Sequence, residues 1–284
     1  IPASFDLTSA APIYAHDVNY ADDDTDRQAC HLFLPDSTGK HPLVIYIHGG
    51  GFTGGSRDVV LGNSAGIADI KYFLDQGIAY ASIGYRLIST SQADPDGVIK
   101  SLTDAKRALQ FIRHHAPELH LDPERIVLSG NSAGAGASVW LATRDDMADP
   151  DAADPVLRES TRVCAVHSGG GQATYDLYKW ESEVYNNYDG QGTTYTIDSM
   201  VNLQGFATYS NFYGGLDSNY QVLYDADLIQ YRQDVDMLYH MSDDDPPLYL
   251  ENGALQLLPR DTLYHHSLNG QPLLQVALSA GISE

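Results

Sequence analysis

A serine flanked by glycines gives the sequence its clearest chemical signal. Ser132 stands in Gly130-Asn-Ser-Ala-Gly134, directly after the apolar run Ile126-Val-Leu128 and before a helix-forming stretch of small residues that begins at Ala135. A tight turn from a buried strand into a helix strains its central residue and exposes the side chain, and the glycines prevent collisions. The pattern predicts that Ser132 is a nucleophile. The competing interpretation is a serine in an ordinary strand-to-helix turn.

A second glycine-rich motif precedes the serine. His48-Gly-Gly-Gly-Phe52 follows the apolar run 42–47, which predicts a strand buried on both faces. Glycines let the backbone approach a ligand, and their N–H groups can point at a developing negative charge. We expect Gly50, Gly51 and Ala133 to form an oxyanion hole, with His48 holding the loop by a hydrogen bond. A phosphate-binding loop is excluded because the required Lys-Ser/Thr pair is missing.

A serine nucleophile needs an imidazole within hydrogen-bonding reach and a carboxylate that orients its other nitrogen. Two adjacent histidines, His265 and His266, lie before the final predicted helix, and the sequence does not decide between them. The acid is either Asp176, after the sixth predicted strand, or Asp261. We predict His266 as the base and Asp176 as the acid. The competing interpretation is that the two histidines merely begin a surface helix.

The composition narrows the range of partners. The chain has 284 residues, with 16 Lys and Arg against 38 Asp and Glu, which gives a net charge of −22. Such a charge repels phosphates, so it argues against binding to nucleic acid or to anionic membranes. No stretch approaches the roughly 20 apolar residues of a membrane span. We expect a monomer or a weak homodimer.

Metals and cofactors have no signature in the sequence. His and Asp residues lack a compact ligand spacing such as His-Glu-x-x-His, and a serine nucleophile needs no ion, so we expect no metal and no cofactor. Cys30 and Cys164 lie in apolar, alternating stretches, and we expect both to be free, buried thiols.

Strands and helices alternate through the first 170 residues. This order predicts an α/β fold with an open, twisted, mostly parallel sheet and helices on both faces, and a site at the carboxyl ends of the strands. Residues 1–284 are expected to form one domain, with a tyrosine-rich insertion at about 169–245 that covers the site. The predicted strands are 12–20, 28–35, 42–48, 78–86, 126–128, 162–167 and 246–250, and the predicted helices are 64–76, 98–115, 135–142 and 272–280.

With these motifs in this order, the sequence resembles the α/β-hydrolase superfamily, in particular its hormone-sensitive-lipase-like and carboxylesterase branch. The matching residues are His48-Gly-Gly-Gly-Phe52, Ser101-Leu-Thr-Asp-Ala-Lys-Arg107, Leu121-Asp-Pro-Glu-Arg125 and Gly130-Asn-Ser-Ala-Gly134. The resemblance implies that Ser132 attacks an ester carbonyl, that Gly50, Gly51 and Ala133 stabilise the oxyanion, and that a lid shapes the pocket.

The likeness weakens toward the end of the chain. The family places its acid as an Asp after the seventh strand and its histidine after the eighth. Here Glu251-Asn-Gly253 follows the seventh predicted strand, and the sequence ends at Glu284 with no histidine after His266. We therefore expect the last strand to be absent and the base to have moved, or to have been lost.

The expected function is a serine esterase for short-chain or aromatic carboxylic esters, or for acylated sugars, with a small-molecule ester as partner. Two alternatives stay open: a peptidase or amidase on the same fold, and a non-catalytic ligand-binding protein that has lost its base. The first residue is Ile1, which fits removal of a secretion signal, a tag or a disordered end. The location therefore stays open between secreted or periplasmic and cytoplasmic.

Overall fold

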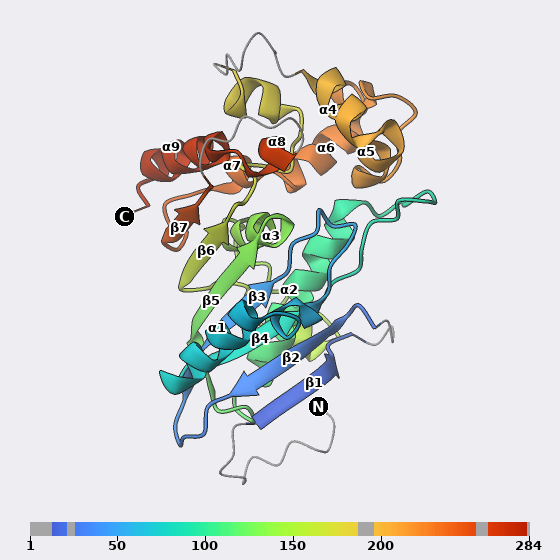
Figure 1. Cartoon of the computed structure of the whole chain (residues 1–284). Coiled ribbons are helices and arrows are strands. Elements are labelled where there is room, and N and C mark those ends of the chain that lie inside the picture. Colours follow the sequence, from blue (N-terminus) through green and yellow to red (C-terminus); the bar gives the residue numbers. More distant parts are fainter. Residues whose placement is uncertain (1–12, 22–25, 187–195, 254–260, 283–284) are drawn as a thin grey trace.

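A computed structural model describes residues 13–21, 26–186, 196–253 and 261–282 of the chain. Within these ranges a seven-stranded sheet has the order β1-β2-β4-β3-β5-β6-β7 (Figure 1). β1 and β4 both run antiparallel to β2, and β3 to β7 run parallel to one another. The strands are β1 Ile13–Asn19, β2 Ala29–Leu34, β3 His41–Ile47, β4 Ala79–Ile83, β5 Leu121–Asn131, β6 Ala165–Gly169 and β7 Leu248–Glu251.

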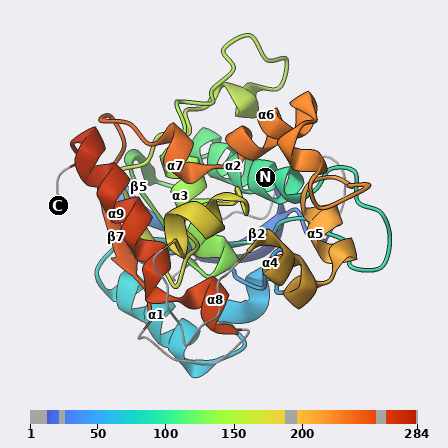
Figure 2. The ribbon, with the colours of Figure 1, turned by 90° about the horizontal axis from the view of Figure 1, so that it is seen from above.

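Helices cover both faces of this sheet, as predicted. Seen from above, α1 lies on one side of the strands and α2 and α3 lie on the other (Figure 2). The helices are α1 Ser64–Asp75, α2 Val98–His114, α3 Ala133–Ala142, α4 Ile197–Gln204, α5 Phe206–Phe212, α6 Ala226–Asp234, α7 Met237–His240, α8 Asp261–His265 and α9 Gly270–Ala280. The short helical turns are η1 Arg57–Val60, η2 Pro155–Arg158, η3 Trp180–Val184, η4 Gln221–Leu223 and η5 Ser267–Asn269.

The buried faces follow the sequence pattern. The apolar stripe of α2 consists of Ile99, Leu102, Ala105, Leu109 and Ile112, and all of these except the half-buried Ile99 are buried in the hydrophobic core. All ten residues of α3 are buried, because its Ala- and Gly-rich sequence lets it pack closely against the strands. A side chain at Gly134 would place its Cβ 2.0 Å from the carbonyl oxygen of Ile47 at the end of β3. α3, which follows the serine, therefore packs directly on the end of β3, which precedes the glycine loop.

The described residues between β6 and β7, which we call the cap (within residues 170–247), lie above the carboxyl ends of the strands (Figure 1). Aromatic side chains form its interior, where Trp180, Tyr185, Tyr209 and Tyr213 are all buried. These four aromatic residues belong to the same hydrophobic core as the strands and the helices that cover them.

The cap is followed by β7, which is the last strand in the described part of the chain. Cys30 is buried and free as predicted, but the free Cys164, directly before β6, is exposed. None of the helices within the described ranges is long and apolar enough to cross a membrane.

Candidate active site

Ser132 occupies a sharp turn between β5, which ends at Asn131, and α3, which begins at Ala133. Its backbone has φ 55° and ψ −122°, a conformation that L-residues rarely adopt. The flanking glycines are sterically required, since a Cβ at Gly130 would lie 2.3 Å from the carbonyl carbon of Gly134. The structure thus contains the strained strand-to-helix turn that the sequence pattern predicts.

Two hydrogen bonds hold the backbone of this turn. The N–H of Ser132 donates to the carbonyl oxygen of Gly169 at the end of β6, at 2.8 Å. The carbonyl of Ser132 accepts from the N–H of Gly136 at 3.1 Å. Ser132 is therefore fixed to the neighbouring strand and to the first turn of α3.

The glycine loop approaches this turn from β3. Gly50, Gly51 and Phe52 have positive φ angles of 113°, 61° and 60°, which turn the chain sharply after the strand. A Cβ at Gly49 would lie 2.7 Å from the carbonyl oxygen of Asn131, so the loop packs directly on the residue before the serine. Gly50, Gly51, Ser132 and Ala133 line one cavity, as an oxyanion hole requires.

His48 anchors the start of the glycine loop. Its Nδ1 bonds the carbonyl of Gly49 at 2.7 Å, and its ring stacks on Tyr85 with centroids 4.1 Å apart. The hydroxyl of Tyr85 donates to the carbonyl of His48 at 2.8 Å. Burial lowers the pKa of His48 to about 4, so the imidazole is neutral at pH 7. These contacts fit the structural role expected for His48.

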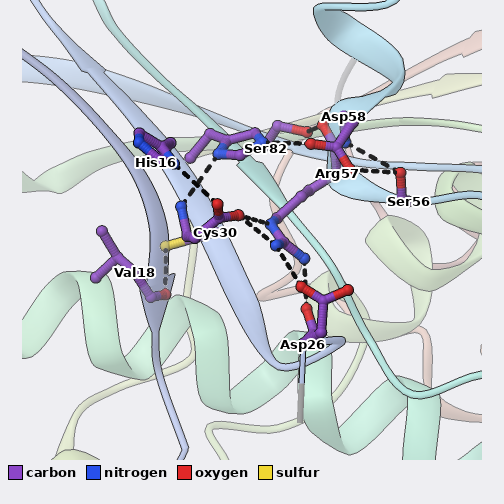
Figure 3. A network of polar contacts seen from close by, with 10 residues as sticks. His16, Val18, Asp26, Cys30, Ser56, Arg57, Asp58 and Ser82 are labelled. Atoms are coloured by element: carbon purple, nitrogen blue, oxygen red, sulfur yellow. Dashed lines mark hydrogen bonds and ion pairs between the residues drawn. The ribbon is translucent and has the colours of Figure 1, made fainter. Parts of the chain in front are cut away.

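A polar network anchors the other end of the loop, where η1 begins (Figure 3). The guanidinium of Arg57 bonds Asp17 of β1, with Nε 2.9 Å from Oδ1, and also bonds Asp26 at 2.9 Å. The carbonyl of Arg57 accepts from the Ser82 hydroxyl of β4 at 2.8 Å. Hydrogen bonds from His16 and from Arg57 lower the pKa of Asp17 to about 2. The glycine loop is therefore held at its start by Tyr85, which follows β4, and at its other end by Asp17 of β1 and Ser82 of β4.

The cavity beside Ser132 has a volume of about 590 Å³ and extends from the glycine loop to the cap. Its aromatic lining residues are Phe52, Tyr175, Trp180, Phe212 and Tyr264. None of the described residues that line it is Asp, Glu, Lys or Arg. A groove of about 630 Å³ between α1 and the end of β2 contains neither Ser132 nor any residue of the glycine loop. The smaller cavity is thus the one that contains the candidate nucleophile and the glycine loop.

His265, the last residue of α8, reaches the cavity. Its Nε2 lies 3.4 Å from Oγ of Ser132, and its Nδ1 lies 2.9 Å from the carbonyl oxygen of Gly170. A proton on Nδ1 would be donated to Gly170, which leaves Nε2 free to accept from the serine. The Gln172 side chain donates to the carbonyl of Tyr264 at 2.7 Å and so holds the residue before His265. The sequence offered no signal for Gly170 or Gln172.

The structure places His266, our predicted base, elsewhere. Its side chain is 3% exposed, its Nδ1 accepts from the N–H of Leu268 at 3.1 Å, and its ring contacts Tyr185. Adjacent residues at the end of a short helix point in different directions, and here it is His265 that faces the cavity. His265 therefore replaces His266 as the histidine beside Ser132.

Asp176, our predicted acid, is bound to a cation in the cap. Its carboxylate forms a two-fold ion pair with Arg232, with distances of 2.8 and 2.9 Å, and the residue is 3% exposed. Burial raises the pKa of this carboxyl, and the ion pair opposes that rise. Asp176 therefore joins two parts of the cap instead of orienting His265. The alternative acid, Asp261, has a side chain that lies outside the described part of the structure.

Metal ligands do not gather in the described part of the chain, where no group of three or more His, Cys, Asp or Glu residues could hold an ion. The arrangement that the structure does contain is a strained serine, a histidine in contact with it and a glycine loop beside it. These parts can perform nucleophilic attack on a carbonyl group.

The chain is similar to several known proteins. A family model described as BD-FAE matches residues 30–213. Acetylcholinesterase of Gallus gallus is 35% identical over 98 residues, which is 34% of this chain and 12% of that protein. Carboxylesterase NlhH of Mycobacterium tuberculosis is 32% identical over 105 residues, which is 36% of this chain and 28% of that protein. The chain thus spans less than a third of the length of either relative.

A solved structure with the same fold is a truncated form of a carbohydrate esterase from gut microbiota. Its TM-score to this chain is 0.68 at 17% sequence identity, and the alignment covers 95% of this chain and 84% of the other. This likeness concerns the fold, and it extends over the sheet and most of the cap.

Proposed function

Since the chain belongs to the BD-FAE family, within the α/β-hydrolase superfamily, we propose that it is a serine esterase whose nucleophile is Ser132. One observation carries the proposal: Oγ of Ser132 lies 3.4 Å from Nε2 of His265 at the wall of a cavity that the glycine loop also lines. Catalytic hydrogen bonds are often long in the absence of substrate, so this distance suits a resting enzyme.

The reaction follows from the positions of these groups. Nε2 of His265 takes the proton of the Ser132 hydroxyl as Oγ bonds to the ester carbon, and the N–H groups of Gly50, Gly51 and Ala133 stabilise the oxyanion. The tetrahedral intermediate expels the alcohol oxygen, which takes the proton from His265. Water, activated by the same imidazole, then hydrolyses the acyl-enzyme and restores Ser132.

His265 is oriented without a carboxylate among the described contacts of its ring. The carbonyl of Gly170, 2.9 Å from Nδ1, is the group that fixes the tautomer and partly balances the positive charge on the imidazole during the reaction. A carbonyl stabilises that charge less than a carboxylate does. We therefore expect a slower enzyme than one with a complete Ser-His-Asp triad.

The cavity supports small, uncharged substrates. Aromatic rings supply apolar walls, and Thr90, Gln172, Gln204 and Thr208 supply hydroxyl and amide groups. We infer short or aromatic acyl groups, and a leaving alcohol that carries hydroxyls, as in an acylated sugar. The carbohydrate esterase of similar fold supports this choice of alcohol.

A panel of matched substrates tests the proposal. The enzyme should hydrolyse p-nitrophenyl acetate and butyrate and an acetylated xyloside faster than the decanoate or a hemisuccinate ester, which carries a negative charge. The corresponding p-nitroanilides separate an esterase from an amidase, because an amidase would cleave both series. Binding of these esters without turnover would favour the non-catalytic alternative.

A further inference from the structure

Tyr175 belongs to the cap segment that follows β6, and it contacts the residues that form the proposed oxyanion hole. It is 2% exposed, and its hydroxyl donates to the carbonyl oxygen of Ala133 at 2.6 Å. Its ring contacts the ring of Phe52 edge-on, with centroids 5.1 Å apart and an interplanar angle of 77°. One side chain therefore touches both segments that supply the proposed N–H donors.

The hydrogen bond from Tyr175 to Ala133 helps to orient the N–H of Ala133, which is the proposed oxyanion-hole donor in the serine turn. The peptide unit that carries the N–H of Ala133 begins with the carbonyl of Ser132, which accepts from the N–H of Gly136 at 3.1 Å. The next carbonyl, that of Ala133, is held by Tyr175. Because the carbonyls on both sides of it are anchored, the N–H of Ala133 has a fixed direction.

Gly136 makes room for this hydrogen bond. A Cβ at position 136 would lie 2.1 Å from the Tyr175 hydroxyl oxygen and 2.6 Å from the ring carbon that carries it. The hydroxyl can reach Ala133 only because this residue of α3 has no side chain. Gly136 does not belong to the Gly-x-Ser-x-Gly pattern, and the structure explains it by the room that the Tyr175 hydroxyl needs.

The contact between Tyr175 and Phe52 supports the glycine loop, whose N–H groups at Gly50 and Gly51 are the other proposed donors. Phe52 follows Gly51, has a φ of 60°, and its carbonyl accepts from the N–H of Ile88 at 2.7 Å. Its buried ring packs between Tyr175 and Tyr85, whose centroid lies 5.8 Å away. A loop held in this strained conformation needs such lateral support to keep its N–H groups aimed at one point.

We propose that Tyr175 is a positioning residue that fixes the two parts of the oxyanion hole, the glycine loop and the N–H of Ala133, relative to each other. The inference rests on the proposed function, and it goes further by assigning a role to a cap residue that does not take part in bond making. Donors stabilise a transition state to the extent that they are already in place before the reaction. The Tyr175 hydroxyl contributes by fixing Ala133, and its ring contributes by fixing Phe52.

The test compares Tyr175→Phe with Tyr20→Phe. Tyr20 is a matched control, because it is 1% exposed and its hydroxyl donates to a backbone carbonyl, that of Gly84, at 2.7 Å. Tyr20 follows the edge strand β1, and neither Tyr20 nor Gly84 lines the cavity beside Ser132. Removing a whole oxyanion-hole donor lowers kcat by about 10² to 10³, so loss of a support should lower it by about tenfold. We expect kcat for p-nitrophenyl acetate to fall by that factor in Tyr175→Phe with KM within twofold, and Tyr20→Phe to keep the parent kcat.

The affinity of a transition-state analogue is a second measurement, and it tests the oxyanion hole directly. The affinity of a trifluoromethyl ketone, which forms a tetrahedral oxyanion with the serine, should fall in Tyr175→Phe by the same factor as kcat/KM. If Tyr175→Phe does not fold, Gly136→Ala displaces the hydroxyl without removing it and should produce the same pattern.

The proposal is overturned if Tyr175→Phe keeps kcat and inhibitor affinity within twofold of the parent. It is also overturned if KM alone rises, because Tyr175 would then be a substrate-binding residue. A parent protein that hydrolyses no ester would remove the proposed function as well, whereas an active parent with an unaffected Tyr175→Phe variant would remove this inference alone.

Discussion

Ser132 and His265 are 133 positions apart in the sequence, yet Oγ of the serine and Nε2 of the histidine lie 3.4 Å apart. Both residues are held by the same short stretch of chain at the end of β6. The N–H of Ser132 bonds the carbonyl of Gly169 at 2.8 Å, and Nδ1 of His265 bonds the carbonyl of Gly170 at 2.9 Å. Two consecutive carbonyls therefore set the positions of the nucleophile and its proposed base.

Replacement of His265 by alanine should remove most of the catalysis. Without an acceptor for the Ser132 proton, kcat for p-nitrophenyl acetate should fall by about 10³-fold, while KM changes little. Steady-state kinetics on the purified variant measures both values.

His266→Ala is the matched control for that experiment. Its imidazole is buried and caps η5 through Leu268, so the variant should lose about 1 kcal/mol of stability and keep kcat within threefold. The assignment of His265 fails if His266→Ala is the inactive variant, or if His265→Ala retains the parent kcat.

Replacement of Asp176 by asparagine separates a structural role from a catalytic one. The change breaks a buried ion pair and leaves Arg232 without its carboxylate, so the free energy of unfolding should fall by about 3 kcal/mol. Urea denaturation measures this loss, and kcat at a temperature where the variant is folded should stay within about fivefold. A folded Asp176→Asn protein whose kcat has fallen a thousandfold would restore Asp176 as the catalytic acid.

The parts of the site that the sequence predicts correctly are those set by local structure. Ser132 lies in the expected turn because the apolar strand, the flanking glycines and the small-residue helix are contiguous in the chain. The His48 loop follows a strand for the same reason. The parallel part of the sheet was predictable because β3, β4, β5 and β6 are apolar runs that alternate with the helices α1, α2 and α3.

The choice between His265 and His266 depends on how α8 docks on the cap, which the sequence does not encode locally. His265 faces the cavity because Gln172 holds the carbonyl of Tyr264 and Tyr185 donates to the carbonyl of Leu263. Likewise, the partner of Asp176 is Arg232, 56 residues further along the chain. Such pairings arise from tertiary packing, and periodicity cannot reveal them.

His48 should make the stability of the protein depend on pH. Burial lowers the pKa of His48 from its ordinary value near 6.5 to about 4. Between these values the unfolded chain binds more protons than the folded one, so the free energy of unfolding should fall as the pH drops from 6.5 to 4. The loss attributable to this residue is roughly 3 kcal/mol below pH 4.

Denaturation curves at several pH values check this, with His48→Asn as the reference. The asparagine amide can replace Nδ1 as the donor to Gly49 but does not titrate. The difference in stability between the parent and His48→Asn should therefore be constant above pH 6.5 and shrink below it. A difference that does not change with pH would show that His48 has no part in acid sensitivity.

The central claim is that Ser132 is the nucleophile, and covalent labelling tests it most directly. A fluorophosphonate should add once per chain, on the peptide that contains Ser132, and should abolish hydrolysis of p-nitrophenyl acetate in proportion to the label. Ser132→Ala should take up no label and should lose turnover by at least about 10⁴-fold. A label on another serine, or a Ser132→Ala protein that cleaves the ester at the parent rate, would show that Ser132 is not the nucleophile.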